Sequence, residues 1–206
     1  MHKYITEIIG TFFLVLTVGL TGNPLAIGCA LMVMVYMGGH ISGAHYNPAV
    51  TLAVFLRGRL PASEVAPYMA AQIIGALAAA LVFYVTKSTT FAAAPGADVG
   101  LGAALLVEVI FTFALALVVL NTATSRETEG NSYFGLAIGF TVVVAAFAGG
   151  GISGGAFNPA VGVGPMIVDG VLGTGPLGHI WLYIVGPLAG GALAAYTFRL
   201  QHPDGD

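Results

Sequence analysis

The sequence ISGAHYNPAV at Ile41–Val50 occurs a second time, slightly altered, as ISGGAFNPAV at Ile152–Val161. Both copies contain Ile-Ser-Gly followed, at the same internal spacing, by Asn-Pro-Ala-Val, and they lie 111 positions apart. An apolar run follows the proline of each copy, AVTLAVFL after Pro48 and AVGVGPMIV after Pro159. Because asparagine caps helices and proline suits the first helical turn, each copy predicts a loop that leads into a helix of about two turns.

The composition indicates an integral membrane protein. The 206 residues are 57% hydrophobic and only 7% charged, and the mean hydropathy is +0.93, whereas a soluble domain contains about 25% charged residues. A helix of two turns is too short to cross a bilayer, which takes about 20 residues. Two short helices at matching places therefore point to a permeation or binding site near the membrane midplane. The single cysteine, Cys29, excludes an internal disulfide, and no basic run suggests a nucleic-acid partner.

Six apolar segments are long enough to span the lipid bilayer. The second and fifth are the shortest, which is expected where a loop that re-enters the membrane follows and completes the depth. The segments are Tyr4–Leu20, Leu25–Tyr36 with an extension toward His40, Glu64–Val85, Leu101–Leu120, Tyr133–Ala148 and Leu177–Leu200.

The basic residues indicate how these segments are oriented. With six crossings and a cytoplasmic N-terminus, Lys87 falls outside and the other five fall on the cytoplasmic side: Lys3, Arg57, Arg59, Arg126 and Arg199. This distribution follows the positive-inside rule. It predicts a multi-pass protein of the cell membrane with both termini in the cytoplasm. Trp181 and Tyr183, near the outer end of the last segment, suit interfacial aromatic positions.

The repetition extends beyond the decapeptide. TEIIGTFFL at Thr6–Leu14 is similar to VEVIFTFAL at Val107–Leu115. We therefore expect one channel domain over residues 1–206, with a first repeat at about 1–86 and a second at about 101–200. Three spans in each half are an odd number, so the halves run in opposite directions through the membrane. The short helices then enter from opposite faces, and Asn47 and Asn158 meet near the centre.

This arrangement predicts a path for neutral solutes. A helix N-terminus carries roughly half a positive charge, so two of them at the midplane repel cations while the asparagine amides offer hydrogen-bond donors. The residues before each asparagine are not helical, and at this depth they must line a cavity or be buried in protein. Their carbonyls supply a ladder of acceptors, for which the candidates are Gly43, Ala44, His45, Gly154 and Ala156.

With these motifs the chain resembles the aquaporin, or major intrinsic protein, family over nearly its whole length. A single Asn-Pro-Ala would be a weak signal, but two with matching flanks and six spans are specific. The resemblance implies an all-α hourglass of six tilted helices and two re-entrant half-helices arranged as an inverted repeat. It also implies a pore in each protomer of a homotetramer, no cofactor and no enzymatic activity. The pore residues that it implies are Asn47, Pro48, Ala49, Asn158, Pro159 and Ala160.

Glu7 and Glu108 occupy matching places in the first segment of each half. Carboxylates within a membrane are functional candidates, and a proton relay is one interpretation. The alternative, which the resemblance favours, is that each accepts hydrogen bonds from the loop of its own half. His40 and His45 could similarly form a metal pair, but no further ligand lies beside them, so a hydrogen-bonded strut is the better interpretation of His45.

Four positions predict the selectivity of the pore by comparison with this family: Ile27, Ala146, Gly155 and Val161. Family members that pass only water carry bulky aromatics, a histidine and an arginine there, and this chain has none of them. Val161 resembles the plant vacuolar branch, whose members also pass ammonia and urea. Gly162 replaces an aspartate that is typical of glycerol facilitators, which counts against a standard glycerol channel.

The prediction is a passive channel for water and small uncharged solutes, with ammonia and also urea or glycerol among them. An inverted-repeat secondary transporter is a second class, but it requires a titratable or ion-coordinating group beside the repeated motifs. A structural junction protein with a narrow or closed pore is a third. A flux that is driven by the solute gradient alone and does not saturate would distinguish the channel from both of these classes.

Overall fold

The computed structural model describes residues 1–175 and 177–203, and in these ranges the chain is helical without any strand. Six helices are long and apolar enough to cross a membrane, with mean hydropathies from 1.4 to 2.7. They are α1 (His2–Thr21), α2 (Pro24–Ser42), α4 (Ala62–Lys87), α5 (Leu101–Val119), α6 (Phe134–Ser153) and α8 (Ile180–Gln201). Two shorter helices, α3 (Pro48–Leu56) and α7 (Pro159–Leu172), lie between them.

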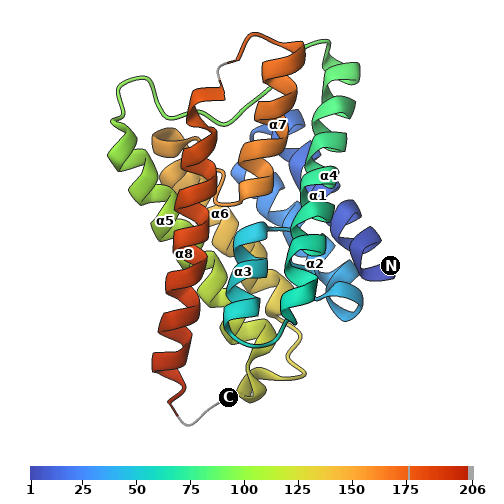
Figure 1. Ribbon diagram of the computed structural model, residues 1–206, viewed down its shortest axis with the longest axis vertical. Coiled ribbons are helices and arrows are strands. Elements are labelled where there is room, and N and C mark those ends of the chain that lie inside the picture. The colour runs from blue at the N-terminus through green and yellow to red at the C-terminus, as the bar shows by residue number, and fades with distance from the viewer. Residues whose placement is uncertain (176, 204–206) are drawn as a thin grey trace.

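The short helices lie one above the other between α8 and α4 (Figure 1). In the view of Figure 1, α7 occupies the upper part of the molecule and α3 the lower part. Each also packs against the last long helix of the opposite half, α3 against α8 and α7 against α4. The long helices pair in the same way in both halves, α1 with α4 and α5 with α8, while α2 packs against α6.

Glycine allows the closest of these helix pairs. A Cβ at Gly75 of α4 would overlap the carbonyl oxygen of Ile8 in α1, and one at Gly190 of α8 would overlap that of Val109 in α5. Small residues let helix backbones approach in this way inside membranes. The two crossings occupy equivalent places, so the same type of contact packs the helices within each half.

Several predicted boundaries differ from the observed ones. The second segment, predicted to extend beyond Tyr36 toward His40, continues to Ser42, and the fifth continues past Ala148 to Ser153. A left-handed glycine ends each of these helices. The second short helix has 14 residues rather than about two turns, because Pro165 is accommodated inside it. Hydropathy does not detect these extensions, since the added residues are mostly glycine, serine and histidine.

The interfacial position predicted for Tyr183 is wrong. Its side chain is fully buried, whereas Trp181 is 41% exposed and is consistent with that prediction. Tyr183 and Trp181 are two residues apart on one helix, so their side chains point in different directions. The hydropathy pattern alone does not reveal which of them faces the interior.

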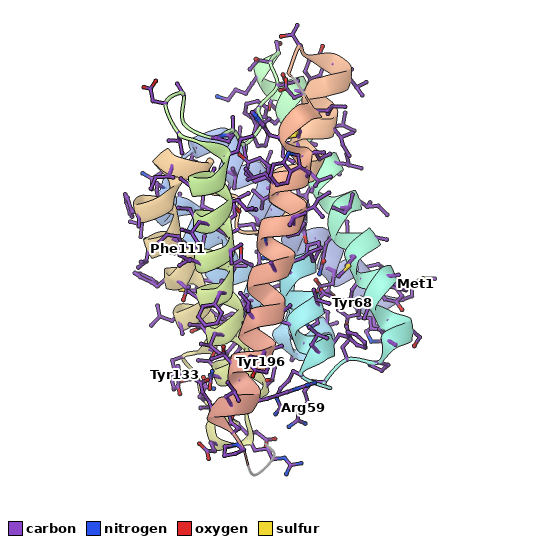
Figure 2. All side chains as sticks on the ribbon, turned by 60° about the vertical axis from the view of Figure 1, so that its left-hand side comes forward. Met1, Arg59, Tyr68, Phe111, Tyr133 and Tyr196 are labelled. Atoms are coloured by element: carbon purple, nitrogen blue, oxygen red, sulfur yellow. The ribbon has the colours of Figure 1, made fainter. Side chains whose placement is uncertain are left out.

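Most basic residues gather at one end of the molecule. Arg199 donates to the Leu56 carbonyl, and the Arg57 guanidinium lies 4.5 Å from the ring centre of Phe198. Arg59 lies at the lower end of the molecule in Figure 2. Lys87 ends α4 at the opposite end. The predicted cytoplasmic C-terminus itself, residues 204–206, lies outside the described residues.

Candidate pore

The two short helices meet at their N-termini, and the repeated asparagines form this junction. Asn47 and Asn158 are the N-cap residues of α3 and α7, and their Oδ1 atoms accept from the N–H groups of Ala49 and Ala160 at 2.8 and 2.9 Å. The Nδ2 of Asn47 donates to the Phe157 carbonyl at 2.9 Å, and the Nδ2 of Asn158 donates to the Tyr46 carbonyl at 2.8 Å. Each cap therefore also holds the loop of the other half.

An unusual backbone precedes each asparagine. Gly43 and Gly154 end α2 and α6 with φ of 83° and 90°, and the next turns place Ala44, Tyr46 and Phe157 at φ near 50°. Side-chain-bearing residues rarely adopt this left-handed conformation, which persists only where the surroundings enforce it. The enforcing groups are therefore part of the site.

Two buried carboxylates enforce this conformation. Glu7 accepts from the backbone N–H of His45 at 3.0 Å and of Tyr46 at 2.7 Å. Glu108 accepts from Ala156 at 3.0 Å and from Phe157 at 2.7 Å. A serine of each loop, Ser42 or Ser153, also donates its hydroxyl to the carboxylate of its own half at 2.7 Å.

These bonds determine where the loop carbonyls point. In a trans peptide the N–H and the C=O point in opposite directions. Because the N–H groups of residues 45 and 46 face Glu7, the carbonyls of Ala44 and His45 point away from it. By the same geometry, the carbonyls of Gly155 and Ala156 point away from Glu108. The loops thus present a short series of acceptors on the side opposite the carboxylates.

The halves differ behind the loops. In the first, His45 Nδ1 lies 3.1 Å from Thr51 Oγ1, and Gln72 Nε2 donates to both Thr51 and Glu7 at 2.9 and 2.8 Å. In the second, the corresponding residues are Ala156, Gly162 and Pro187, and none of them has a side-chain hydrogen-bonding group. A Cβ at Gly162 would overlap Tyr183. The second loop therefore lacks the polar network that lies behind the first.

A cavity of about 330 Å³ extends from this junction toward the end of the molecule that carries Pro24. The four predicted selectivity positions, which come from α2, α6 and the second loop, all line it: Ile27, Ala146, Gly155 and Val161. Its other walls include Asn47, Asn158 and Ala44 together with aliphatic side chains such as Leu14 and Leu115. No Asp, Glu, Lys or Arg is among the described residues that line it.

A second cavity of about 750 Å³ lies on the side of Arg59 and Arg126. It shares His45, Val119 and Ile138 with the first cavity, so the two meet near His45. Gly43 lines only this second cavity, whereas Gly154 and Ala156 line the first.

Some predicted site residues do not reach either cavity wall. Pro48, Ala49, Pro159 and Ala160 are buried in the first turns of α3 and α7, where they begin the helices. His40 lines the second cavity, but no group of three potential metal ligands exists among the described residues.

Several residues that hold the two loops were not predicted from the sequence. Ser42 and Ser153 lie inside the repeated decapeptide, so their repetition was a signal that could have identified them. Tyr68 and Tyr183 occupy corresponding places in α4 and α8 at a spacing of 115 positions, which differs from that of the decapeptide, and Gln72 has no identical partner in the opposite half. Only the folded arrangement brings them to the loops.

Comparison with known proteins agrees with this geometry. Aquaporin NIP1-3 of Oryza sativa subsp. japonica is 42% identical over 97% of this chain and 73% of its own length. Glycerol uptake facilitator protein-like 6 of Lactiplantibacillus plantarum is 37% identical over 98% of both chains. The solved aquaglyceroporin from Plasmodium falciparum has the same fold, with a TM-score of 0.84 at 21% identity over 96% of this chain and 94% of its own. Residues 16–198 match the family described as Major intrinsic protein. The chain therefore belongs to the major intrinsic protein family, whose members include the aquaporins.

Proposed function

We propose that this protein is a passive channel through which water, ammonia, and urea or glycerol cross the cell membrane between α3 and α7. Membership of the family makes it a channel for water and small solutes rather than an enzyme. The observation that supports the broader solute range is the first cavity. We expect it to face the outside of the cell and call it the outer cavity, and we call the second the inner cavity. The four constriction residues of the outer cavity, Ile27, Ala146, Gly155 and Val161, supply no side-chain hydrogen-bond donor.

The central asparagines bind the solute in this proposal. A side-chain amide has two N–H donors, and one N–H of Asn47 and of Asn158 is used on the carbonyl of the opposite loop. The second N–H of each amide is available to a water oxygen or a solute carbonyl or hydroxyl. The carbonyls of Ala44, His45, Gly155 and Ala156 accept the hydrogens of the passing molecule.

Cation exclusion follows from the same elements. An entering cation loses its hydration between apolar walls and meets the positive N-terminal ends of α3 and α7. No carboxylate among the described residues lines the first cavity to compensate for this loss, and Glu7 and Glu108 are fully buried with oxygens that accept bonds from the loops. We therefore assign both carboxylates as structural anchors and not as a proton relay.

The same wall argues against a secondary transporter. Coupling to an ion requires a titratable or coordinating side chain on the path. Among the described residues, His45 is the one histidine on the first cavity wall, and its Nδ1 is already paired with Thr51. A channel that needs only a gradient fits these residues better.

The assembly and placement belong to the same proposal. We expect a homotetramer in which every protomer contains its own pore. The basic end formed by Lys3, Arg59, Arg126 and Arg199 faces the cytoplasm, which places both termini there.

Stopped-flow light scattering of proteoliposomes tests the proposal. Vesicles with purified protein are mixed with an impermeant osmolyte to measure water flux, and then with urea, glycerol or an ammonium salt. We expect fast flux that rises linearly with the gradient and needs no ion gradient. Flux that saturates or requires a sodium or proton gradient would support a transporter, and protein-free rates would indicate a closed structural protein.

A further inference from the structure

Two tyrosine hydroxyls from different helices reach the same backbone position in the two re-entrant loops. Tyr68 of α4 donates to the carbonyl of Ser42 at 2.8 Å, and Tyr183 of α8 donates to that of Ser153 at 2.6 Å. Both carbonyls belong to the last residue of a long helix, directly before its left-handed glycine. Both tyrosines are buried, with exposed fractions of 3% and 0%.

The internal repeat preserves this shared contact. Ser42 and Ser153 correspond to each other in the repeated decapeptide. The equivalent crossings of Gly75 on Ile8 and of Gly190 on Val109 relate α4 to α8 by 115 positions, and the same spacing relates Tyr68 to Tyr183. Both halves therefore keep the same hydroxyl on the same carbonyl, which points to a requirement of the loop itself.

The physical requirement is a partner for a helix-end carbonyl. The last carbonyls of a helix have no partner within the helix, and water does not satisfy them inside a bilayer. The two cavities can supply water near these carbonyls, since Ser42 lines the inner one and Gly154 lines the outer one. Without a tyrosine hydroxyl, the carbonyl gains a partner by turning toward that water and into the conducting path.

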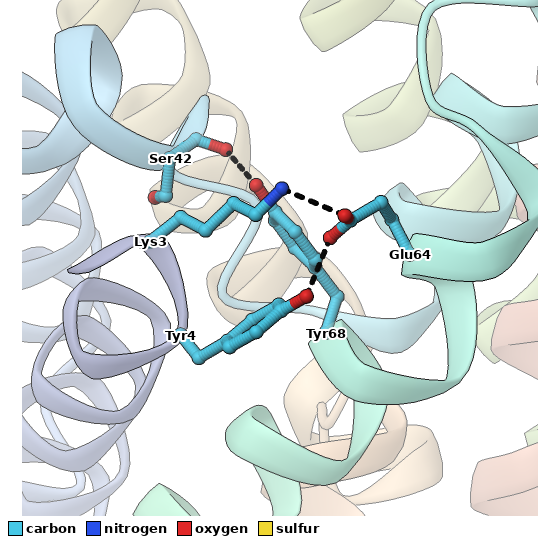
Figure 3. A network of polar contacts seen from close by, with 5 residues as sticks. All are labelled: Lys3, Tyr4, Ser42, Glu64 and Tyr68. Atoms are coloured by element: carbon cyan, nitrogen blue, oxygen red, sulfur yellow. Dashed lines mark hydrogen bonds and ion pairs between the residues drawn. The ribbon is translucent and has the colours of Figure 1, made fainter. Parts of the chain in front are cut away.

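The surroundings of each tyrosine support this role. The Tyr68 ring lies 5.0 Å from the His45 ring and meets the edge of Tyr4 at 5.8 Å. Tyr4 in turn donates to Glu64 at 2.8 Å, and Lys3 pairs with Glu64 at 2.8 Å (Figure 3). Tyr68 is therefore supported from the protein surface and contacts the histidine where the two cavities meet.

Tyr183 is placed behind the outer constriction. A Cβ at Gly154 would lie 2.9 Å from the Tyr183 hydroxyl, and a Cβ at Gly162 would overlap the Cβ of Tyr183. These glycines directly precede Gly155 and directly follow Val161. The tyrosine thus supports two of the four constriction residues from the side away from the cavity.

We propose that Tyr68 and Tyr183 are positioning residues for permeation, which hold the inner and outer loops and keep the Ser42 and Ser153 carbonyls out of the path. This inference rests on the proposed channel function. It is tested with Tyr68→Phe and Tyr183→Phe in proteoliposomes of equal protein content. Tyr36→Phe is the matched control, because Tyr36 also donates to a carbonyl, that of Ser132 at 3.0 Å, outside both loops.

We expect the water permeability per channel to fall at least about threefold in Tyr68→Phe and in Tyr183→Phe, with that of Tyr36→Phe unchanged. Tyr183→Phe should also lower the ratio of urea to water permeability, because a carbonyl turned into the outer constriction narrows it. If a phenylalanine variant does not reconstitute, Gly162→Ala for the outer loop and Glu64→Gln for the inner loop should reduce permeability in the same direction.

Lower melting temperatures with wild-type permeability per channel would show that the tyrosines only stabilise the fold, and would overturn the inference. A change in one of the two variants alone would overturn the assignment for the other loop. Absence of water flux in the wild-type protein would instead overturn the channel function, and the inference with it.

Discussion

At the scale of single residues, the two loop anchors carry different numbers of hydrogen bonds. Glu7 accepts from Ser42, His45, Tyr46 and Gln72, whereas Glu108 accepts from three donors of its own loop. Each donor loses its water partners on folding, so an anchor that no longer accepts leaves buried N–H groups unpaired. The anchors should therefore affect stability in proportion to their bonds.

Replacing either anchor with glutamine tests this relation. The amide group of Glu108→Gln keeps one acceptor oxygen but sets an N–H against one loop donor, which should cost about 1–3 kcal/mol. Glu7→Gln should cost more, because Oε2 of Glu7 accepts from both Tyr46 and Gln72. Thermal melting in detergent measures the order. Normal stability with loss of a pH-dependent flux would indicate a proton relay instead.

The central asparagines give a second prediction at this scale. Asn158→Asp removes the donor to the Tyr46 carbonyl and places a negative charge between the two helix N-termini. Cation exclusion should weaken, since the carboxylate opposes the positive ends of α3 and α7. Electrical recording in planar bilayers measures the cation conductance. An unchanged conductance in a folded, water-permeable variant would contradict the assigned role of Asn158.

At the scale of helices, the repeated decapeptide predicted the helix boundaries more accurately than the apolar segments did. Its Asn-Pro pairs predicted the starts of α3 and α7 at Pro48 and Pro159 correctly, because capping and the fixed φ of proline are local effects. The end of α6 was predicted five residues short, at Ala148 instead of Ser153, and that of α2 only toward His40, because a left-handed glycine ends each helix where hydropathy has already fallen. Tyr68 and Tyr183 could not be predicted as loop contacts, since they depend on how α4 and α8 pack.

The pairing of α5 with α8 can be tested at one glycine. In Gly190→Ala the new methyl group would overlap the carbonyl oxygen of Val109, which should cost about 1–3 kcal/mol of stability. Gly102→Ala in α5 is the control, because a Cβ there meets nothing within 4 Å. Melting temperatures and yields of the two purified variants provide the comparison. Equal stability would show that α5 and α8 are not held at this crossing.

At the scale of the whole molecule, three separate segments bring the four predicted selectivity positions to one cavity. Ile27 comes from α2, Ala146 from α6, and Gly155 and Val161 from the second loop and α7. Their distances along the chain are large, so only the meeting of the two halves brings them to one cavity. Counting from the repeated asparagines predicted four positions that all line this cavity, and their role in selectivity stays a prediction.

Introducing bulky and polar side chains at the predicted constriction should narrow the range of solutes that permeate. The triple variant Ile27→Phe, Ala146→His and Val161→Arg adds bulk and a fixed guanidinium donor to a wall that lacks both. Flux of urea and glycerol should be lost while some water flux remains, as measured in proteoliposomes of matched protein content. If the wild-type protein already excludes every solute larger than water, another residue must narrow the path.

The crossed bonds between Asn47 and Phe157 and between Asn158 and Tyr46 also bear on how such a chain could arise. Neither half can complete its own centre, because each asparagine amide needs a carbonyl from a unit inserted the other way up. A single-repeat ancestor would therefore have required copies in both orientations in one membrane. Separate expression of residues 1–94 and 95–206 is a present-day equivalent: water flux should return only when both fragments are made together.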